Sequence, residues 1–234
     1  MKEKNFSFKY LGIGLLFILS YFILSNVLMI ALVKISMPNT NSQATLYYFI
    51  VCLISLLLYF LVFRKQLIKS FSNFKKNYKK YISIAFSYWI KGFFIMVVSN
   101  YILNTFLKTG QSTNELENIA LLKGNLLIHT ITVVLIAPFI EELVFRLSFN
   151  KMTKNKHLFS IITGTIFGFI HIITSLSLKN PLNILLLVPY SAMGVALGYS
   201  YKETDNIFTS LSMHMIHNFI SVLILIISIK GGIL

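Results

Sequence analysis

The chain has 234 residues, of which 56% are hydrophobic and 12% are charged, and its mean hydropathy is +0.76. This composition excludes an ordinary soluble domain and indicates a single integral membrane domain over residues 1–234. The net charge of +14 does not indicate nucleic-acid binding, because the basic residues stand between long apolar runs without a zinc-finger or RNP-type motif. Loops that face an anionic membrane surface explain these charges better.

The apolar runs predict an all-α polytopic bundle of about seven transmembrane helices, with eight as the alternative count. The first run is too long for the apolar part of a cleaved signal peptide and lacks a small-x-small cleavage site, so we expect a retained helix. Cys52, the single cysteine, lies inside an apolar run and is expected to be a packing residue. The expected spans are residues 11–33, 46–63, 81–107, 125–149, 158–176, 182–201 and 206–229.

Basic residues are divided unevenly between the connections of these spans. The segment Arg64 to Lys80 is rich in lysine and arginine, contains no acidic residue, and is expected to be a loop; Lys151, Lys154 and Lys156 follow the fourth span. Residues 108–124 hold both signs of charge and are expected to be an external loop. The positive-inside rule therefore predicts a cytoplasmic N-terminus and a cytoplasmic Arg64 to Lys80 segment. The Lys-, Asn-, Ile- and Phe-rich usage is typical of an AT-rich bacterial genome, which favours a bacterial cell membrane.

Residues 136–149 place Glu141, Glu142 and Arg146 inside an apolar run. Each ionised side chain near the middle of a bilayer costs roughly 2.5 to 3.5 kcal/mol on insertion scales, so these residues are present for packing or for chemistry. On a helix, Arg146 lies about 40° from Glu142 but about 140° from Glu141. We therefore expect Glu142 to pair with Arg146, and Glu141 to have no partner in its own helix. Pro138 is expected to bend or loosen the helix just before the acidic pair.

Two later spans carry polar residues at helical spacing. Phe167 and His171 are four residues apart, as are His214 and Asn218, so each pair shares one helix face. His217 can join the second face or simply bond a carbonyl. A lone buried histidine is usually a satisfied core residue, but in lipid it needs a partner. Small residues spaced by four predict ordinary close helix packing in the fifth and sixth spans: Gly164 and Gly168, Gly194 and Gly198.

Three motifs stand in order along the chain: E-E-L-V-F-R at 141–146, F-G-F-I-H at 167–171 and H-M-I-H-N at 214–218. Together they resemble the EExxxR, FxxxH and HxxxN motifs of the CPBP family of intramembrane proteases. That family includes the type II CAAX prenyl endopeptidases and the bacterial Abi and bacteriocin-immunity proteins. All three motifs are matched without substitution, and they lie within the helices expected at about 125–229. The first three spans look generic.

The resemblance implies an intramembrane endopeptidase that cleaves a membrane-associated or lipid-modified peptide or protein. It implies that Glu141 and His171 activate water, and that His214 and Asn218 stabilise the oxyanion. Hydrogen-bond donors held in a dry cavity are especially effective at that second task. Supporting roles are implied for Glu142, Arg146 and Phe167.

No cofactor is expected, although Glu141, His171 and His214 could form a three-ligand zinc site with an open water position. The sequence contains no HExxH motif, and an asparagine beside the second histidine is better explained as an oxyanion donor. Metal-free glutamate chemistry is therefore the preferred hypothesis, and zinc is the alternative.

Two other classes of function remain open. One is a non-catalytic protein, for example one that gives bacteriocin self-immunity by binding a partner. The other is a proton-coupled transporter, for which intramembrane glutamates and histidines are also typical. A transporter should spread polar residues along a path through several helices, whereas here they cluster on three spans. The expected partners are membrane lipid and a hydrophobic or membrane-anchored peptide substrate.

Overall fold

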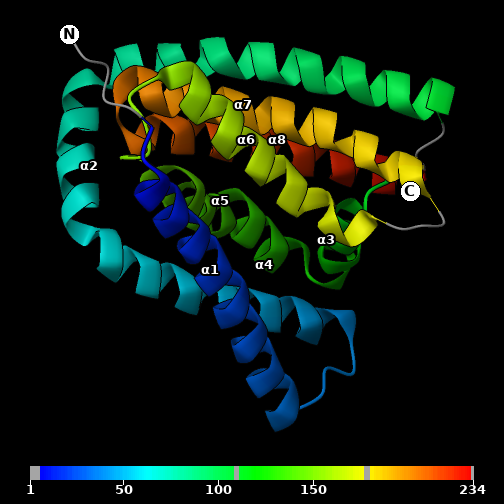
Figure 1. Ribbon diagram of the computed structural model, residues 1–234. Coiled ribbons are helices and arrows are strands. Elements are labelled where there is room, and N and C mark those ends of the chain that lie inside the picture. Colours follow the sequence, from blue (N-terminus) through cyan, green and yellow to red (C-terminus); the bar gives the residue numbers. More distant parts are fainter. Residues whose placement is uncertain (1–5, 108–110, 177–179, 233–234) are drawn as a thin grey trace, which may run out of the picture.

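The computed structural model describes residues 6–107, 111–176 and 180–232, and every regular element in these ranges is a helix (Figure 1). The all-α prediction is confirmed. Residues 1–5 and 108–110, which include parts of the predicted basic terminus and external loop, lie outside these ranges. The α-helices are α1 (Phe8–Ile35), α2 (Asn41–Ile102), α3 (Thr113–Gly124), α4 (Leu126–Ile131), α5 (Ala137–Glu142), α6 (Lys156–Ile172), α7 (Leu187–Thr204) and α8 (Ile207–Lys230). Shorter turns are the π-helical η1 (Leu103–Leu107), η2 (Thr132–Ile136) and η3 (Leu143–Leu147) and the 3₁₀-helical η4 (Ile173–Ser175) and η5 (Pro181–Leu186).

Six helices among the described residues are long and apolar enough to cross a membrane. Five of them correspond one to one with predicted spans. The remaining one, Asn41–Leu107, contains both the second and the third predicted span. The chain is therefore an integral membrane helix bundle, in which two of the seven expected spans belong to one continuous helix.

The basic segment Arg64 to Lys80 is helical, and the prediction of a loop there was wrong. Helix α2 has 62 residues, and a straight helix of that length would extend about 93 Å, about three times the apolar thickness of a bilayer. Figure 1 shows that α2 instead bends and wraps around the other helices, so that its two apolar parts lie on opposite sides of the bundle. The segment contains neither proline nor glycine, so nothing in it ends a helix. Its lysines and its arginine are all exposed.

Most of the predicted external loop is also helical. Helix α3 begins with a capping pattern, because the hydroxyl of Ser112 accepts a hydrogen bond from the Glu115 amide. Ile119 and Leu122 are buried, and the Thr45 hydroxyl donates to the Leu121 carbonyl, which joins α3 to the start of α2. A Cβ added at Gly124 would come within 2.5 Å of the Asn41 carbonyl oxygen, so glycine permits this contact.

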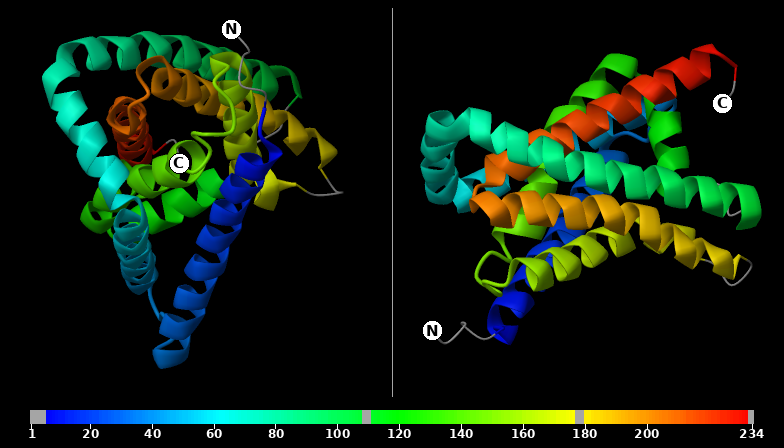
Figure 2. Two further views of the ribbon diagram at one scale, coloured as in Figure 1. Left: turned by 60° about the vertical axis from the view of Figure 1, so that its left-hand side comes forward. Right: turned by 90° about the horizontal axis from the view of Figure 1, so that it is seen from above.

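The segments that the charge pattern placed on one side of the membrane do lie at one end of the bundle. They are the start of α1, the middle of α2, the turn after η3 and the connection between α7 and α8. The end of α8 at Lys230 lies away from these segments (Figures 1 and 2). Three hydrogen bonds join the four segments: Ser7 N to Met152 O (2.8 Å), Lys202 Nζ to Asn150 O (2.9 Å) and Asn206 Nδ2 to Ser70 O (2.8 Å).

Helices α6 and α7 pack closely along their glycines, as predicted. A Cβ at Gly164 would lie 2.4 Å from the Val195 nitrogen, and a Cβ at Gly194 would lie 2.6 Å from the Gly164 carbonyl oxygen. Only a residue without a side chain permits such an approach. The close crossing also leaves backbone carbonyls of both helices within reach of a long side chain from the neighbouring segment formed by α5 and η3.

Candidate functional site

The two glutamates lie in a short helix with a wide helical turn on each side. Helix α5 has only six residues, between η2 and η3. In η2 the Ala137 amide donates to the Thr132 carbonyl, and in η3 the Ser148 amide donates to the Leu143 carbonyl, five residues earlier in both cases. Such π turns inside helices frequently mark functional sites. The irregular turn beside Pro138 agrees with the prediction that this proline loosens the helix.

Arg146 is fully buried, and its guanidinium joins three helical segments. Its Nε lies 3.7 Å from Glu142 Oε2, so the predicted ion pair is present. Its Nη2 donates to the Gly194 carbonyl at 3.0 Å, and its Nη1 donates to the Thr163 carbonyl at 3.4 Å. The guanidinium also lies 5.4 Å from the centre of the Phe167 ring. The arginine therefore both neutralises Glu142 and fastens α6 and α7 to the acidic helix.

His214 of α8 lies between the two glutamates. Its Nδ1 is 3.1 Å from Glu142 Oε1, and its Nε2 is 3.4 Å from Glu141 Oε2. An ionised carboxylate only accepts hydrogen bonds, so Nδ1 donates to Glu142, and Nε2 forms an ion pair with Glu141 when the imidazole is protonated. The two carboxylates, the imidazolium and Arg146 then sum to zero charge, which an apolar interior requires. Glu141 has no partner in its own helix, as predicted, but α8 supplies one.

His171 is held by its own helix and by α7. Its Nδ1 lies 2.9 Å from the Phe167 carbonyl oxygen, and because a carbonyl only accepts, Nδ1 carries a hydrogen, which leaves the lone pair of a neutral imidazole on Nε2. The imidazole packs against the Phe167 ring at 4.2 Å and stacks on Tyr190 at 5.5 Å. The edge of Phe167 also meets His214 at 5.7 Å. In the described part of the chain, Glu141 thus contacts His214, while Phe167 connects the two histidines.

Asn218 shares the face of α8 that points to the acidic segment, as its spacing from His214 predicts. Its Nδ2 donates to the Val133 carbonyl in η2 at 2.8 Å. The sequence did not decide whether His217 joins this face. Its ring has an edge contact with Phe93 of α2, with 6.4 Å between the ring centres. The second polar stripe therefore consists of His214 and Asn218.

The first two helices contribute residues that the sequence motifs do not mark. Tyr21 of α1 and Tyr48 and Cys52 of α2 lie within electrostatic range of the Glu141 carboxylate. Tyr48 and Cys52 are four residues apart and share one face of α2. These positions look generic in the sequence, because a tyrosine or cysteine in an apolar span has no distinctive spacing. Only the packing of α1 and α2 around α5 brings them to the site.

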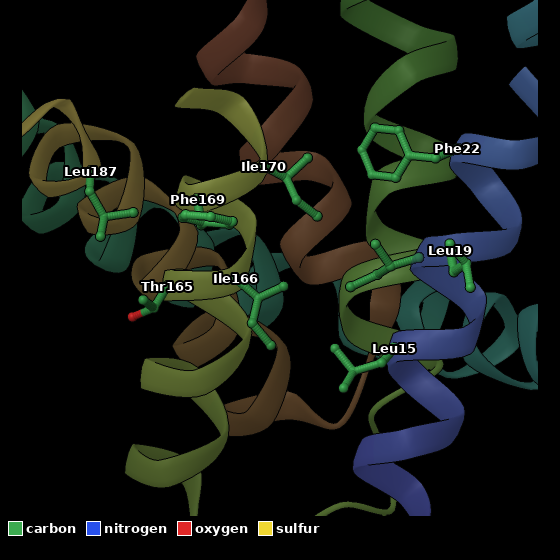
Figure 3. Close-up of a pocket in the computed structure, with 9 residues that line it drawn as sticks. Leu15, Leu19, Phe22, Thr165, Ile166, Phe169, Ile170 and Leu187 are labelled. Carbon is green, nitrogen blue, oxygen red and sulfur yellow. The ribbon is translucent and has the colours of Figure 1, made fainter. Parts of the chain in front are cut away.

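An apolar groove of about 490 Å³ lies between α1 and α6 (Figure 3). Ile170, which lines it, directly precedes His171, so α6 carries the groove and the candidate histidine on neighbouring faces. The groove is suited to hydrocarbon, because its lining is almost entirely aliphatic and aromatic: Leu15, Ile18, Leu19, Phe22, Thr165, Ile166, Phe169, Ile170 and Leu187.

The residues of the zinc alternative do not gather into one ligand set. Residues 6–107, 111–176 and 180–232 contain no group of three His, Cys, Asp or Glu side chains placed to hold a metal ion. Glu141 and His214 are in contact, but His171 is held by Phe167 and Tyr190. Metal-free chemistry at this site remains a hypothesis for experiment.

Comparison with known proteins relates the chain to a protein family and to a relative of known sequence. Residues 123–220, which include all three motifs, match the family model of the type II CAAX prenyl endopeptidase Rce1-like proteins. A protein of Mycoplasma capricolum subsp. capricolum, described as uncharacterized, is 29% identical over 168 residues, which cover 67% of this chain and 48% of the relative. The chain thus spans about half the length of this curated relative. No solved structure matches the chain.

Proposed function

We propose that this chain, whose residues 123–220 belong to the Rce1-like type II CAAX prenyl endopeptidases of the CPBP family, hydrolyses a peptide bond in a membrane-embedded or lipid-anchored substrate. The observation that carries the proposal is the position of His214 between two glutamates of different accessibility. The Glu141 side chain is 17% exposed, whereas that of Glu142 is fully buried. Glu141 is therefore the more accessible of the two carboxylates, and we assign the general base to it.

In the proposed reaction, Glu141 takes a proton from a water molecule as the water oxygen attacks the carbonyl carbon of the scissile bond. His171, with its lone pair on Nε2, is the second acceptor that orients this water. The carbonyl π electrons move onto the oxygen, and the oxyanion accepts hydrogen bonds from Asn218 and from Nε2 of the His214 imidazolium, whose Nδ1 stays on Glu142. When the oxyanion collapses, the C–N bond breaks and the proton on Glu141 passes to the leaving amine.

The other motif residues support this chemistry without touching the substrate. Glu142 accepts from His214 Nδ1 and so fixes the orientation of the imidazole, in the way that a buried carboxylate orients a catalytic histidine. Arg146 neutralises Glu142 and holds it in place. Phe167 keeps the rings of His171 and His214 apart at fixed distances.

The substrate class follows from the setting of the site. The residues of the site lie on membrane-spanning helices, so a substrate has to reach them from within or beside the bilayer. The groove between α1 and α6 offers an apolar surface on the helix that bears His171. We propose that it holds a hydrocarbon part of the substrate, either a lipid chain or the apolar side chains of a membrane segment.

The test begins with the peptides that the enzyme cleaves. Membrane peptides are compared between cells that produce wild type and cells that produce Glu141→Gln, and the identified peptide then serves as substrate for the purified proteins. We expect Glu141→Gln to lower kcat by about 10² to 10⁴, the usual contribution of a general base, with unchanged folded yield. Glu117→Gln, on the exposed side of α3, is the matched control and should keep full activity.

Two results would contradict the glutamate mechanism. Full activity of Glu141→Gln would exclude Glu141 as the base. Loss of wild-type activity in a chelator, with recovery on addition of zinc, would favour the metal-dependent alternative. If cells that produce Glu141→Gln keep the same bacteriocin immunity as cells that produce wild type, the result would instead favour the non-catalytic binding function.

A further inference from the structure

The carbonyl group of Val133 has no donor available from its own helix. In an α-helix this carbonyl would accept from the amide of residue 137, and in a π turn from the amide of residue 138. Here the Ala137 amide donates to Thr132, and residue 138 is a proline, which has no N–H. The wide turn and the proline together leave the Val133 oxygen free for a partner from another helix.

Asn218 of α8 is that partner. Its Nδ2 donates to the Val133 oxygen at 2.8 Å, across 85 residues of sequence. A fully buried carbonyl without a donor costs about 1–3 kcal/mol, and this partly buried contact should contribute less than that to stability. It also has a geometric effect. An amide nitrogen has two hydrogens in the plane of the group, and when one is held by a fixed acceptor, the direction of the other is fixed as well.

We propose that Pro138 is a positioning residue, because it keeps the Val133 carbonyl free to anchor Asn218 and so orients the remaining Asn218 hydrogen as an oxyanion donor. The inference deepens the proposed function and rests on it. A donor that is already oriented needs no reorganisation when charge develops on the substrate oxygen, which makes it effective. The irregular turn beside the acidic pair thereby acquires a role in the reaction.

The alternative is that the bond between Asn218 and Val133 only joins α8 to the acidic segment. Pro138→Ala separates the two possibilities, because it restores an amide hydrogen at residue 138. In one outcome, the new N–H of residue 138 donates to the Val133 carbonyl across the wide turn. In the other, the turn tightens, and the Ala137 amide donates to the Val133 carbonyl in place of the Thr132 carbonyl. In both cases a main-chain donor competes with Asn218 for the carbonyl.

The experiment is a double-mutant cycle with Pro138→Ala and Asn218→Ala in the full-length purified protein. Unfolding temperature, kcat and KM are measured for all four proteins with the peptide substrate. Asn218→Ala should lower kcat by about 10² to 10³, the range for loss of one oxyanion donor. Pro138→Ala should lower kcat by a smaller factor in the wild-type background, hardly at all in the Asn218→Ala background, and should leave KM unchanged in both. Asn218→Ala should also lower the unfolding temperature less when alanine occupies position 138.

The controls address folding and specificity. Pro181→Ala, at the exposed start of η5, removes a proline without freeing or filling a carbonyl at the site and should leave kcat unchanged. Pro138→Ser restores the same N–H and repeats the test if Pro138→Ala gives little folded protein. Additive effects on the unfolding temperature would overturn the contact, and additive effects on kcat would overturn the positioning role. A wild-type protein without peptidase activity would instead refute the function on which the inference rests, whatever the unfolding temperatures show.

Discussion

His214 approaches Glu142 more closely than Glu141, with 3.1 Å between Nδ1 and Glu142 Oε1 against 3.4 Å between Nε2 and Glu141 Oε2. The adjacent glutamates therefore divide two tasks. Glu142 is enclosed, with Arg146 on one oxygen and His214 on the other. Glu141 also contacts His214, but its side chain stays 17% exposed. The helical offset of about 100° between successive residues produces this division.

Arg146→Ala should sharply reduce the amount of folded protein. The substitution leaves Glu142 buried without its neighbouring cation and removes the donors to the Gly194 and Thr163 carbonyls. Breaking a buried ion pair from one side typically costs about 3–5 kcal/mol. The measurement is the yield of monodisperse protein in detergent, compared with wild type at equal expression.

The double variant Glu142→Gln with Arg146→Met is the matched control for that prediction. It leaves neither charge unpaired, so the yield should exceed that of Arg146→Ala alone. Peptidase activity should stay low in the double variant, because His214 Nδ1 has lost the carboxylate that orients it. Equal yields from all variants would show that the ion pair has no structural role.

Gly194→Ala should destabilise the bundle, because its Cβ would lie 2.6 Å from the Gly164 carbonyl oxygen. Overpacking of this kind costs about 1–3 kcal/mol. Gly12→Ala is the comparison, since nothing lies within 4 Å of a Cβ at that position of α1, and it should be neutral or slightly stabilising. Thermal unfolding in detergent measures both. Similar unfolding temperatures for the two variants would contradict the close packing of α6 on α7.

Leu19→Trp should weaken substrate binding by filling the groove between α1 and α6. The indole would occupy space that we assign to a hydrocarbon part of the substrate, so KM should rise about tenfold, equivalent to 1.4 kcal/mol, with kcat little changed. Ile23→Trp places the same side chain on α1 at an exposed position that does not line the groove. If both variants have the KM of wild type, the substrate does not use this groove.

Orientation in the membrane can be tested with single cysteines in a Cys52→Ser background. Cysteines at Lys75 and Lys154 should be shielded from an impermeant reagent in intact cells, whereas a cysteine at Lys123 of α3 should react. The charge pattern motivates the expectation for Lys75 and Lys154. The expectation for Lys123 follows from the position of α3, which lies at the end of the bundle opposite the middle of α2. The reverse pattern would mean an inverted orientation. Opposite behaviour of Lys75 and Lys154 would contradict their location at one end of the bundle.

Several features of the site could be predicted from the sequence because they depend on helical geometry alone. The pairing of Glu142 with Arg146, the shared face of Phe167 and His171, and the glycine contacts all follow from spacing of three or four residues. The Arg64 to Lys80 segment was different. Its charges indicated a loop, yet lysine is a good helix former, and the absence of proline and glycine allows the helix to continue.

The sequence by itself determined an all-helical membrane protein, the approximate spans and the three motifs, because hydrophobic length and residue spacing are local properties. Only the tertiary structure decided which groups meet. His214 contacts both glutamates, Asn218 reaches the carbonyl freed beside Pro138, and α1 and α2 bring unmarked tyrosines close to Glu141. These contacts depend on how separate helices cross, and crossing is set by side-chain packing over the whole bundle, which no single segment of sequence specifies.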